Sequence, residues 1–234
     1  MNNYFQFKQF TIYQDQTAMK VGTDGVLLGA WADLSKADTV LDIGTGTGLI
    51  ALMAAQRNPR AAIDAVEINP AAYRQATENI AQSPWPERIK VYPDSIFCYH
   101  PDKRYDHIVC NPPFFIQSTP APDTARNMAR HCENFTHNAL IKAVLRLLSP
   151  SGKFSVILPA DEAFSFIGKT RETSLCLKRQ TQIYPNPGKK IKRLLMEFVE
   201  YPCIPETTTL TLEISRHNYT EEYIRLTREF YLHM

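Results

Sequence analysis

The chain has 234 residues, 44% of them hydrophobic, and carries 26 basic and 24 acidic side chains for a net charge of +2. This length is sufficient to bury a sizeable core, and the near balance of charge says little about partners. Five cysteines without a CxxC pair argue against a disulfide framework or a zinc ribbon, so we expect no metal site.

No targeting or membrane signal is visible in the chain. The first ten residues lack the basic segment and apolar core of a secretory leader. No apolar run approaches the ~18 residues that span a bilayer. We therefore expect a soluble, cytoplasmic protein of the reducing cytosol, with no membrane contact and no obligate protein partner.

The order of apolar patterns predicts an α/β protein. Residues 4–14 alternate like a strand or hairpin, and residues 24–34 resemble a short helix. From residue 38 onward, short apolar runs alternate with helical patterns, which is typical of a mostly parallel sheet with helices on both faces. Seven strands are expected, over residues 39–44, 61–68, 88–94, 105–111, 153–159, 193–201 and 207–215. Helices are expected over residues 48–58, 69–82, 133–152 and 220–234.

A glycine-rich turn, "LDIGTGTGLI", joins the first core strand to its helix. Gly44, Gly46 and Gly48 allow the backbone to approach a ligand closely at a helix N-terminus. The dinucleotide fingerprint GxGxxG requires glycine where Leu49 stands, and a phosphate loop requires Lys-Ser/Thr after its last glycine. The spacing therefore predicts a nucleoside ligand that lacks a pyrophosphate.

Three acidic residues are candidates for contact with that nucleoside. Glu67, about 20 positions beyond the loop at the end of the next strand, is placed to accept from ribose hydroxyls. Asp94, after the third strand, is suited either to accept from an adenine amino group or to form a simple turn. Asp42 either steadies the loop or meets a ligand ammonium.

Two adjacent prolines follow the strand "YDHIVC", in the segment "NPPFF". Proline has a fixed φ and no N–H, so the chain has to leave the sheet at Asn111 in a rigid turn without a donor. With the glycine loop and Glu67, this segment resembles class I S-adenosylmethionine-dependent methyltransferases that modify planar exocyclic nitrogens. The resemblance implies a Rossmann-like fold, S-adenosylmethionine as the cofactor, and a catalytic role for Asn111, Pro112, Pro113 and Phe114.

The chemistry of such a nitrogen accounts for these residue types. Its lone pair is delocalised, so it is a poor nucleophile. The side-chain oxygen of Asn111 and the carbonyl of Pro112 are suited to accept its two hydrogens and to stabilise the positive charge that develops during attack. Phe114 offers a ring on which a base stacks. Taken alone, the segment also fits a turn followed by core phenylalanines.

The resemblance extends along nearly the whole chain. Segments such as "FKQFTI", "AMKVGTDGVLLGAWA", "QSPWPERI", "ARH" and "YTEEYIRLTREFYLHM" are similar to those of the bacterial tRNA(Val) (adenine-N6)-methyltransferase family. The resemblance implies methylation of N6 of A37, the adenosine just 3′ of the anticodon of tRNA1(Val). It also implies that the segment "KVGTDG", Lys20 to Gly25, lies against the cofactor, with Lys20, Thr23 and Asn111 among the cofactor-binding residues. The family motif is often NPPY, and Phe114 keeps the stacking ring without the hydroxyl.

The same resemblance implies the organisation of the chain. It predicts a single methyltransferase domain, in which residues 1–37 form an extension that covers the cofactor site and residues 38–234 form the Rossmann-like core.

A basic segment favours a nucleic-acid partner. Between residues 168 and 193, eight basic side chains accompany one acidic one. This predicts phosphate contacts or a solvated face about equally. Contacts with a tRNA anticodon loop, whose single-stranded base is easily splayed out, are expected from Arg130, His131, Lys189, Lys190, Lys192 and Arg193. Because the last four lie far in sequence from the glycine loop, we expect them to leave cofactor binding unaffected.

Three other functions fit part of this pattern. A protein glutamine methyltransferase uses the same kind of Asn-Pro-Pro pocket, but such enzymes resemble one another in a separate N-terminal helical domain, and only about forty residues precede the first core strand here. A DNA adenine methyltransferase normally brings a larger target-recognition region. A non-catalytic nucleotide-binding module needs the glycine loop but not Asn111 with its prolines.

Overall fold

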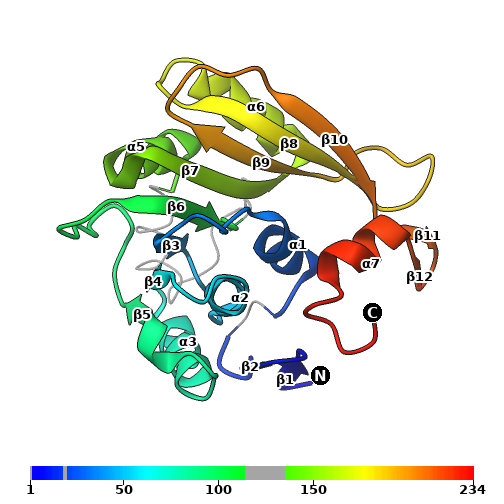
Figure 1. The fold of residues 1–234 in the computed structure, drawn as a ribbon, viewed down its shortest axis with the longest axis horizontal. Helices are drawn as coiled ribbons and strands as arrows, with labels where there is room; N and C mark the ends of the chain where they lie inside the picture. Colours follow the sequence, from blue (N-terminus) through cyan, green and yellow to red (C-terminus); the bar gives the residue numbers. More distant parts are fainter. Residues whose placement is uncertain (1, 18–19, 114–134) are drawn as a thin grey trace, which may run out of the picture.

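An eight-stranded sheet forms the centre of the protein (Figure 1). The computed structural model describes residues 2–17, 20–113 and 135–234. The strand order is β10-β8-β9-β7-β6-β3-β4-β5, and neighbours are parallel except that β9 runs antiparallel to β7 and β8. The strands are β3 (Thr39–Ile43), β4 (Ala62–Val66), β5 (Ile89–Tyr92), β6 (Tyr105–Cys110), β7 (Leu148–Pro159), β8 (Cys176–Tyr184), β9 (Arg193–Val199) and β10 (Glu206–Thr211).

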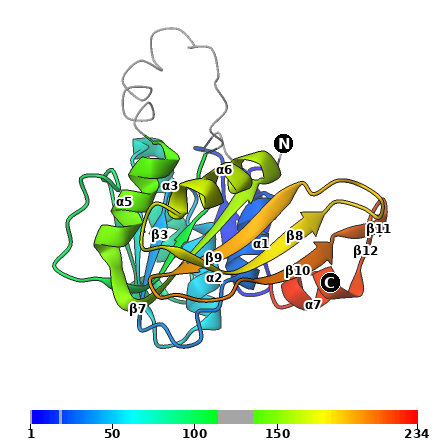
Figure 2. The ribbon, with the colours of Figure 1, turned by 90° about the horizontal axis from the view of Figure 1, so that it is seen from above.

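Helices cover both faces of this sheet (Figures 1 and 2). The alternation of side chains along the strands divides the core in two. Val40 of β3 packs in the cluster that includes α1, α2 and α7, whereas its neighbour Leu41 packs in the cluster that includes α5 and α6. The helices are α1 (Thr23–Trp31), α2 (Leu49–Arg57), α3 (Pro70–Ala81), α5 (His137–Leu147), α6 (Ala160–Thr170) and α7 (Glu221–Thr227), with a short 3-10 turn η1 (Pro86–Arg88).

The sheet confirms the predicted mostly parallel α/β fold, but it has eight strands where the sequence predicted seven. The additional strand is β8, whose residues belong to the basic segment. One of its two charges is neutralised within the fold: Arg179 pairs with Glu197 of β9 at 3.0 Å and stacks over the Trp31 ring at 3.8 Å. Such pairing is invisible in a local hydropathy pattern, which therefore predicts no strand there. The helix α6 has no counterpart among the predicted helices either.

The N-terminal and C-terminal segments pack against each other. The strands β1 (Tyr4–Gln6) and β2 (Thr11–Tyr13) form the predicted hairpin. Phe7, just after β1, pairs by a backbone bridge with Tyr231, and their rings stack 5.9 Å apart. A second hairpin, β11 (Glu213–Ser215) with β12 (Asn218–Tyr219), leads into α7. Figure 1 shows α7 between this hairpin and α1, with both chain ends nearby.

The extension shares its core with the rest of the chain. Phe7, Phe10 and Ile12 are buried in the same hydrophobic cluster as Leu52 of α2. The division of a single domain at residue 37 stays a prediction.

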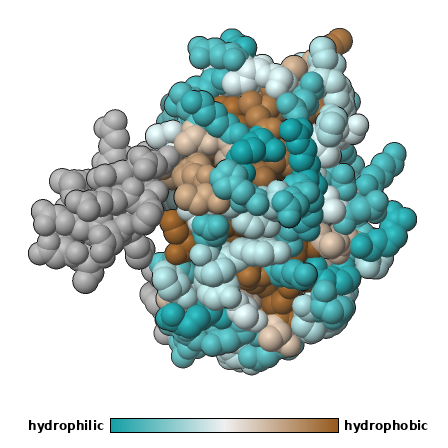
Figure 3. Space-filling model, turned by 90° about the vertical axis from the view of Figure 1, so that its left-hand side faces the viewer, coloured by the Kyte–Doolittle hydropathy of each residue, from teal (hydrophilic) through white to brown (hydrophobic). Residues whose placement is uncertain are grey.

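From the sequence, no membrane-spanning helix was expected. Within residues 2–17, 20–113 and 135–234, no helix is long and apolar enough to cross a bilayer. The side of the molecule that lies at the left in Figure 1 is shown in Figure 3, where apolar side chains lie between hydrophilic ones.

Candidate active site

The glycine loop leaves the carboxyl end of β3 and enters α2. Gly44, Gly46 and Gly48 have φ of +68°, +59° and +86°, which is the left-handed region that disfavours other residues. Gly48 is the N-cap of α2, and a Cβ there would also meet Ala76 at 3.6 Å. The glycines are therefore required by the backbone path, which leaves the loop surface without side chains at Gly44 and Gly46.

Two buried carboxylates hold this loop in place. The Thr45 hydroxyl and the Ala51 N–H donate to one oxygen of Asp42, at 2.6 and 3.2 Å. Burial raises the pKa of Asp42 from 3.8 to about 7. The N–H groups of Gly46 and Asn69 donate to the two oxygens of Glu67, at 2.9 and 2.8 Å. Both acids therefore brace the loop, which is one of the two roles predicted for Asp42.

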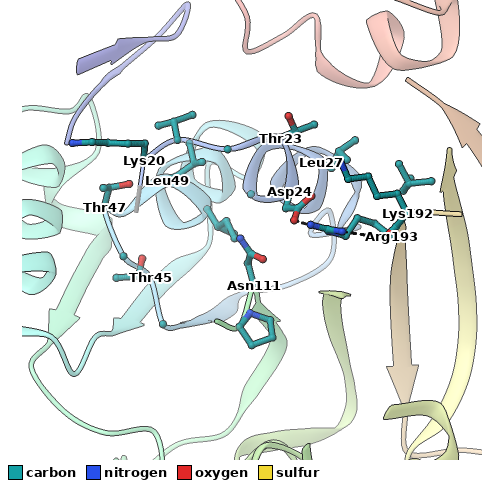
Figure 4. Close-up of a pocket in the computed structure, with 18 of the residues that line it drawn as sticks. Lys20, Thr23, Asp24, Leu27, Thr45, Thr47, Leu49, Asn111, Lys192 and Arg193 are labelled. Atoms are coloured by element: carbon teal, nitrogen blue, oxygen red, sulfur yellow. Dashed lines mark hydrogen bonds and ion pairs between the residues drawn. The ribbon is translucent and has the colours of Figure 1, made fainter. Parts of the chain in front are cut away.

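A cavity of about 390 Å³ lies beside the loop (Figure 4). One wall is the segment 20–25 with Leu27, which leads into α1, and another is the loop 44–47 with Leu49 and Ile50. Asn111 and Pro112 come from the end of β6. The last wall, from the β8–β10 side of the sheet, is made by Ile183, Pro185, Lys192, Arg193 and Leu212.

This cavity brings together part of the predicted site. Its lining includes Lys20, Thr23, Gly44, Gly46, Asn111, Pro112, Lys192 and Arg193. Glu67 and Asp42 stand behind the loop and do not line it, and Lys189 and Lys190 lie outside it. Asp94 accepts a hydrogen bond from the N–H of Ser95 at 2.7 Å, as a turn residue does. Phe114, Arg130 and His131 lie outside the described residues.

Gly25 lets the start of α1 pack closely against Leu49 of α2, beside Asn111. A Cβ at Gly25 would lie 3.0 Å from Leu49 Cδ2 and 3.8 Å from Asn111 Nδ2. Figure 4 shows Asn111 between the loop that carries Thr45 and Thr47 and the residues at the start of α1. The segment "VGTDG" is thus packed onto the catalytic turn predicted from the sequence.

Two residues of the basic segment lie beside the glycine loop, although they are far from it in sequence. Lys192 and Arg193 line the same cavity as Gly44. Arg193 Nε donates to an oxygen of Asp24 at 2.8 Å. The pairing of β9 with β7 and β8 carries Arg193 across the sheet to this position, and sequence distance gives no information about that.

Several lining residues were not singled out in the sequence prediction. Asp24 was covered only as part of the segment "KVGTDG", which was predicted to lie against the cofactor. Ile183, Pro185 and Leu212 had no local signal, because they reach the site only through the pairing of β8 with β9 and β10. Among residues 2–17, 20–113 and 135–234, no cluster of three or more His, Cys, Asp or Glu is arranged to hold a metal ion.

Comparison with known sequences identifies close relatives over the full length. A tRNA1(Val) (adenine(37)-N6)-methyltransferase of Parabacteroides distasonis is 49% identical over 236 residues, covering 100% of this chain and 99% of that protein. One of Phocaeicola vulgatus is 50% identical over 235 residues with the same coverage. One of Trichodesmium erythraeum is 47% identical and covers 98% of both chains.

Solved structures share the fold at low sequence identity. An Agrobacterium tumefaciens protein described as a predicted O-methyltransferase has a TM-score of 0.65 at 19% identity and covers 88% of this chain and 96% of its own. P. horikoshii TYW2 in complex with MeSAdo has a TM-score of 0.58 at 15% identity, covering 83% and 69%. The family model "Methyltransferase small domain" matches residues 21–160. The chain therefore belongs to the tRNA1(Val) (adenine(37)-N6)-methyltransferase family.

Proposed function

We propose that this protein methylates N6 of A37 in tRNA1(Val) in the cytoplasm, with S-adenosylmethionine as methyl donor. The relatives described above are named for this activity, and they align with this chain over its full length. The observation that carries the proposal is the presence of Asn111 and Pro112 on the wall of the cavity beside the glycine loop. Loop and catalytic turn thus face one space.

The residues beside the loop fit a nucleoside cofactor. Gly44 and Gly46 present backbone without side chains, and Lys20 and Thr23 form the opposite wall. Oδ1 of Asp42 is buried and has no hydrogen-bond partner within the described part of the chain, so an acceptor remains near the loop. Glu67, already bound to two N–H groups, retains lone pairs for ribose hydroxyls. When bound, S-adenosylmethionine supplies an electrophilic methyl group.

Asn111 and Pro112 act on the target nitrogen. The Asn111 side-chain oxygen and the Pro112 carbonyl accept its two hydrogens, which stabilises positive charge as the lone pair is released for attack. Pro112 and Pro113 fix the backbone of this turn and present no competing N–H. Holding the nitrogen in a single orientation supplies a further part of the acceleration. Phe114 is proposed as the ring on which the adenine stacks.

Exposed lysines on the loop between β8 and β9 are suited to hold the RNA. Lys189, Lys190 and Lys192 are exposed, and Lys192 also reaches the cavity. RNA phosphates bound along this loop would direct a splayed-out base toward the cavity. Because the anticodon loop is single-stranded, turning that base out of the stack costs little free energy. Arg130 and His131 are proposed as further contacts.

Transfer of a radioactive methyl group decides among substrates. The purified protein is incubated with labelled S-adenosylmethionine and total tRNA, short duplex DNA, or a glutamine-containing protein substrate, followed by nucleoside analysis. We expect N6-methyladenosine in tRNA1(Val) alone. Label in DNA or in protein, with none in tRNA, would contradict the proposal and favour the adenine or glutamine alternatives that the same pocket accommodates.

A further inference from the structure

A second cavity, of about 600 Å³, adjoins the first. It lies between the N-terminal hairpin, the β11–β12 hairpin, α7 and the last residues of the chain. Three residues, Thr23, Pro185 and Leu212, line both cavities. The backbone N–H of Leu212 donates to Tyr184 at 2.9 Å, which fixes this shared wall to the end of β8. The two spaces are therefore neighbours that share one wall.

Aromatic rings dominate the second cavity. Phe5, Tyr219 and Tyr231 are half-buried and contribute to its lining, and Tyr223 lies behind them. The rings of Tyr219 and Tyr223 are 5.2 Å apart, and those of Phe5 and Tyr231 are 6.0 Å apart. A partly exposed ring offers a face on which a nucleobase stacks. The other requirement of a base, polar groups for its edge, is met by Gln6, Asn186 and His233.

A basic loop connects the two cavities. Pro185 lines both cavities and Asn186 lines the second, whereas Lys192 and Arg193 line the first. Lys189 and Lys190 lie between them in sequence and are exposed. A phosphodiester that joins a base in one cavity to a base in the other would therefore lie near positive charge. The aromatic residues that line only the second cavity have no role in binding the methyl donor or in the methyl transfer itself.

We propose that the second cavity binds the base of a nucleotide adjacent to A37, so that the enzyme holds two neighbouring bases of the anticodon loop. The inference rests on the proposed function, because it takes its RNA substrate from there. The two cavities share a wall, and adjacent nucleosides are joined by one phosphodiester. With A37 at Asn111 in the first cavity, the base in the second cavity is therefore that of an immediate neighbour.

Anticodon stem–loops with single abasic positions test this with the wild-type enzyme. One substrate lacks the base on the 5′ side of A37, one lacks the base on the 3′ side, and a control lacks a loop base further away. We expect one of the two neighbouring abasic substrates to bind about tenfold more weakly than the control. If neither does, the inference is overturned without any protein variant.

A thermodynamic cycle with Tyr219→Ala locates the effect. This variant should bind the intact stem–loop about tenfold more weakly than the wild type does. With the sensitive abasic substrate, variant and wild type should bind with similar affinity, because the stacking of ring on base is already lost. Tyr219→Phe keeps the ring and should bind like the wild type. Tyr201→Ala removes an exposed ring outside both cavities and is the matched control. If the affinity losses caused by Tyr219→Ala and by the abasic position are fully additive, the inference is overturned.

The intact stem–loop distinguishes the two proposals. Its methylation at N6 of A37 by the wild type supports the proposed function independently of the second cavity. If the intact substrate is not methylated, the proposed function is overturned and this inference with it. If it is methylated and the losses are additive, only the inference is overturned.

Discussion

Arg193 Nε lies 2.8 Å from a carboxylate oxygen of Asp24, although the two residues are 169 positions apart in the sequence. Asp24 is in the first turn of α1, and Arg193 begins β9 at the end of the basic loop. Figure 4 shows the pair on the wall of the cavity. The ion pair thus connects the loop proposed to hold tRNA to the segment proposed to cover the cofactor.

Arg193→Gln should therefore affect more than RNA binding. Loss of the pair should lower stability by about 1 kcal/mol, because both partners are partly exposed. It should also weaken binding of both cofactor and tRNA. The variant Lys189→Gln/Lys190→Gln is the matched control. It should leave cofactor affinity unchanged and reduce the log–log salt slope of tRNA binding by about 0.7–0.9 per lost contact. Calorimetry and tRNA titrations at several salt concentrations measure this, and equal cofactor affinity in both variants would contradict it.

Asn111→Ala should abolish methyl transfer while cofactor binding stays largely intact. The proposed role of the carboxamide is to accept a hydrogen from the target nitrogen, whereas Gly44, Gly46 and the segment around Thr23 are proposed to hold the cofactor. Single-turnover kinetics beside calorimetry separate the two effects. Near-normal turnover in this variant would remove Asn111 from the catalytic machinery.

Glu67→Ala should have the reverse effect. Its carboxylate accepts from the N–H groups of Gly46 and Asn69 and is proposed to accept from the ribose. Cofactor binding should weaken by about 1–3 kcal/mol, the scale of a charge-assisted hydrogen bond. The rate of transfer at saturating cofactor should change less. Calorimetric titration gives the affinity, and an unchanged value would exclude a role in cofactor binding.

The pH dependence of stability should report on Asp42. Its pKa is raised from 3.8 to about 7 in the folded protein, chiefly by burial. Between these two values the folded state binds more protons than the unfolded state, so the contribution of Asp42 to stability decreases as pH rises from about 4 to about 7. Asp42→Asn lacks this term. Urea unfolding of wild type and variant gives the free energy of unfolding across this pH range. Parallel plots of that free energy against pH would contradict the raised pKa of Asp42.

Gly25→Ala should lower turnover by about ten- to a hundredfold. The added Cβ would lie 3.0 Å from Leu49 Cδ2, so Leu49 has to shift within the cavity that it lines together with Asn111, and small misplacements at such a site are costly in catalysis. Gly168→Ala is the matched control, because Gly168 lies inside α6 with nothing within 4 Å of a Cβ. That variant should keep its activity and gain about 0.5–1 kcal/mol in stability. Equal activities would contradict a packing role for Gly25.

The sequence by itself determined the parts of the site that are local. The glycine loop, the position of Glu67 at the end of the next strand and the Asn-Pro-Pro turn after β6 each lie in a short segment that residue type and spacing identify. The structure adds that Glu67 accepts from the Gly46 N–H, whereas its predicted contact with the ribose stays a prediction. The mostly parallel α/β sheet followed from the same periodicity. The close resemblance to one family, confirmed by full-length relatives, added the tRNA substrate, which the residue chemistry alone left open against DNA and protein.

Only the tertiary structure decided which distant segments meet at the site. The strand β8 was missed because the charge of Arg179 is accommodated by Glu197 and Trp31, which lie 18 and 148 positions away in the sequence. The register of β8, β9 and β10 then brings Ile183, Arg193 and Leu212 to a cavity that also contains Gly44. Such pairings depend on the burial of whole sheet faces and on long-range ion pairs, which a local sequence pattern does not encode.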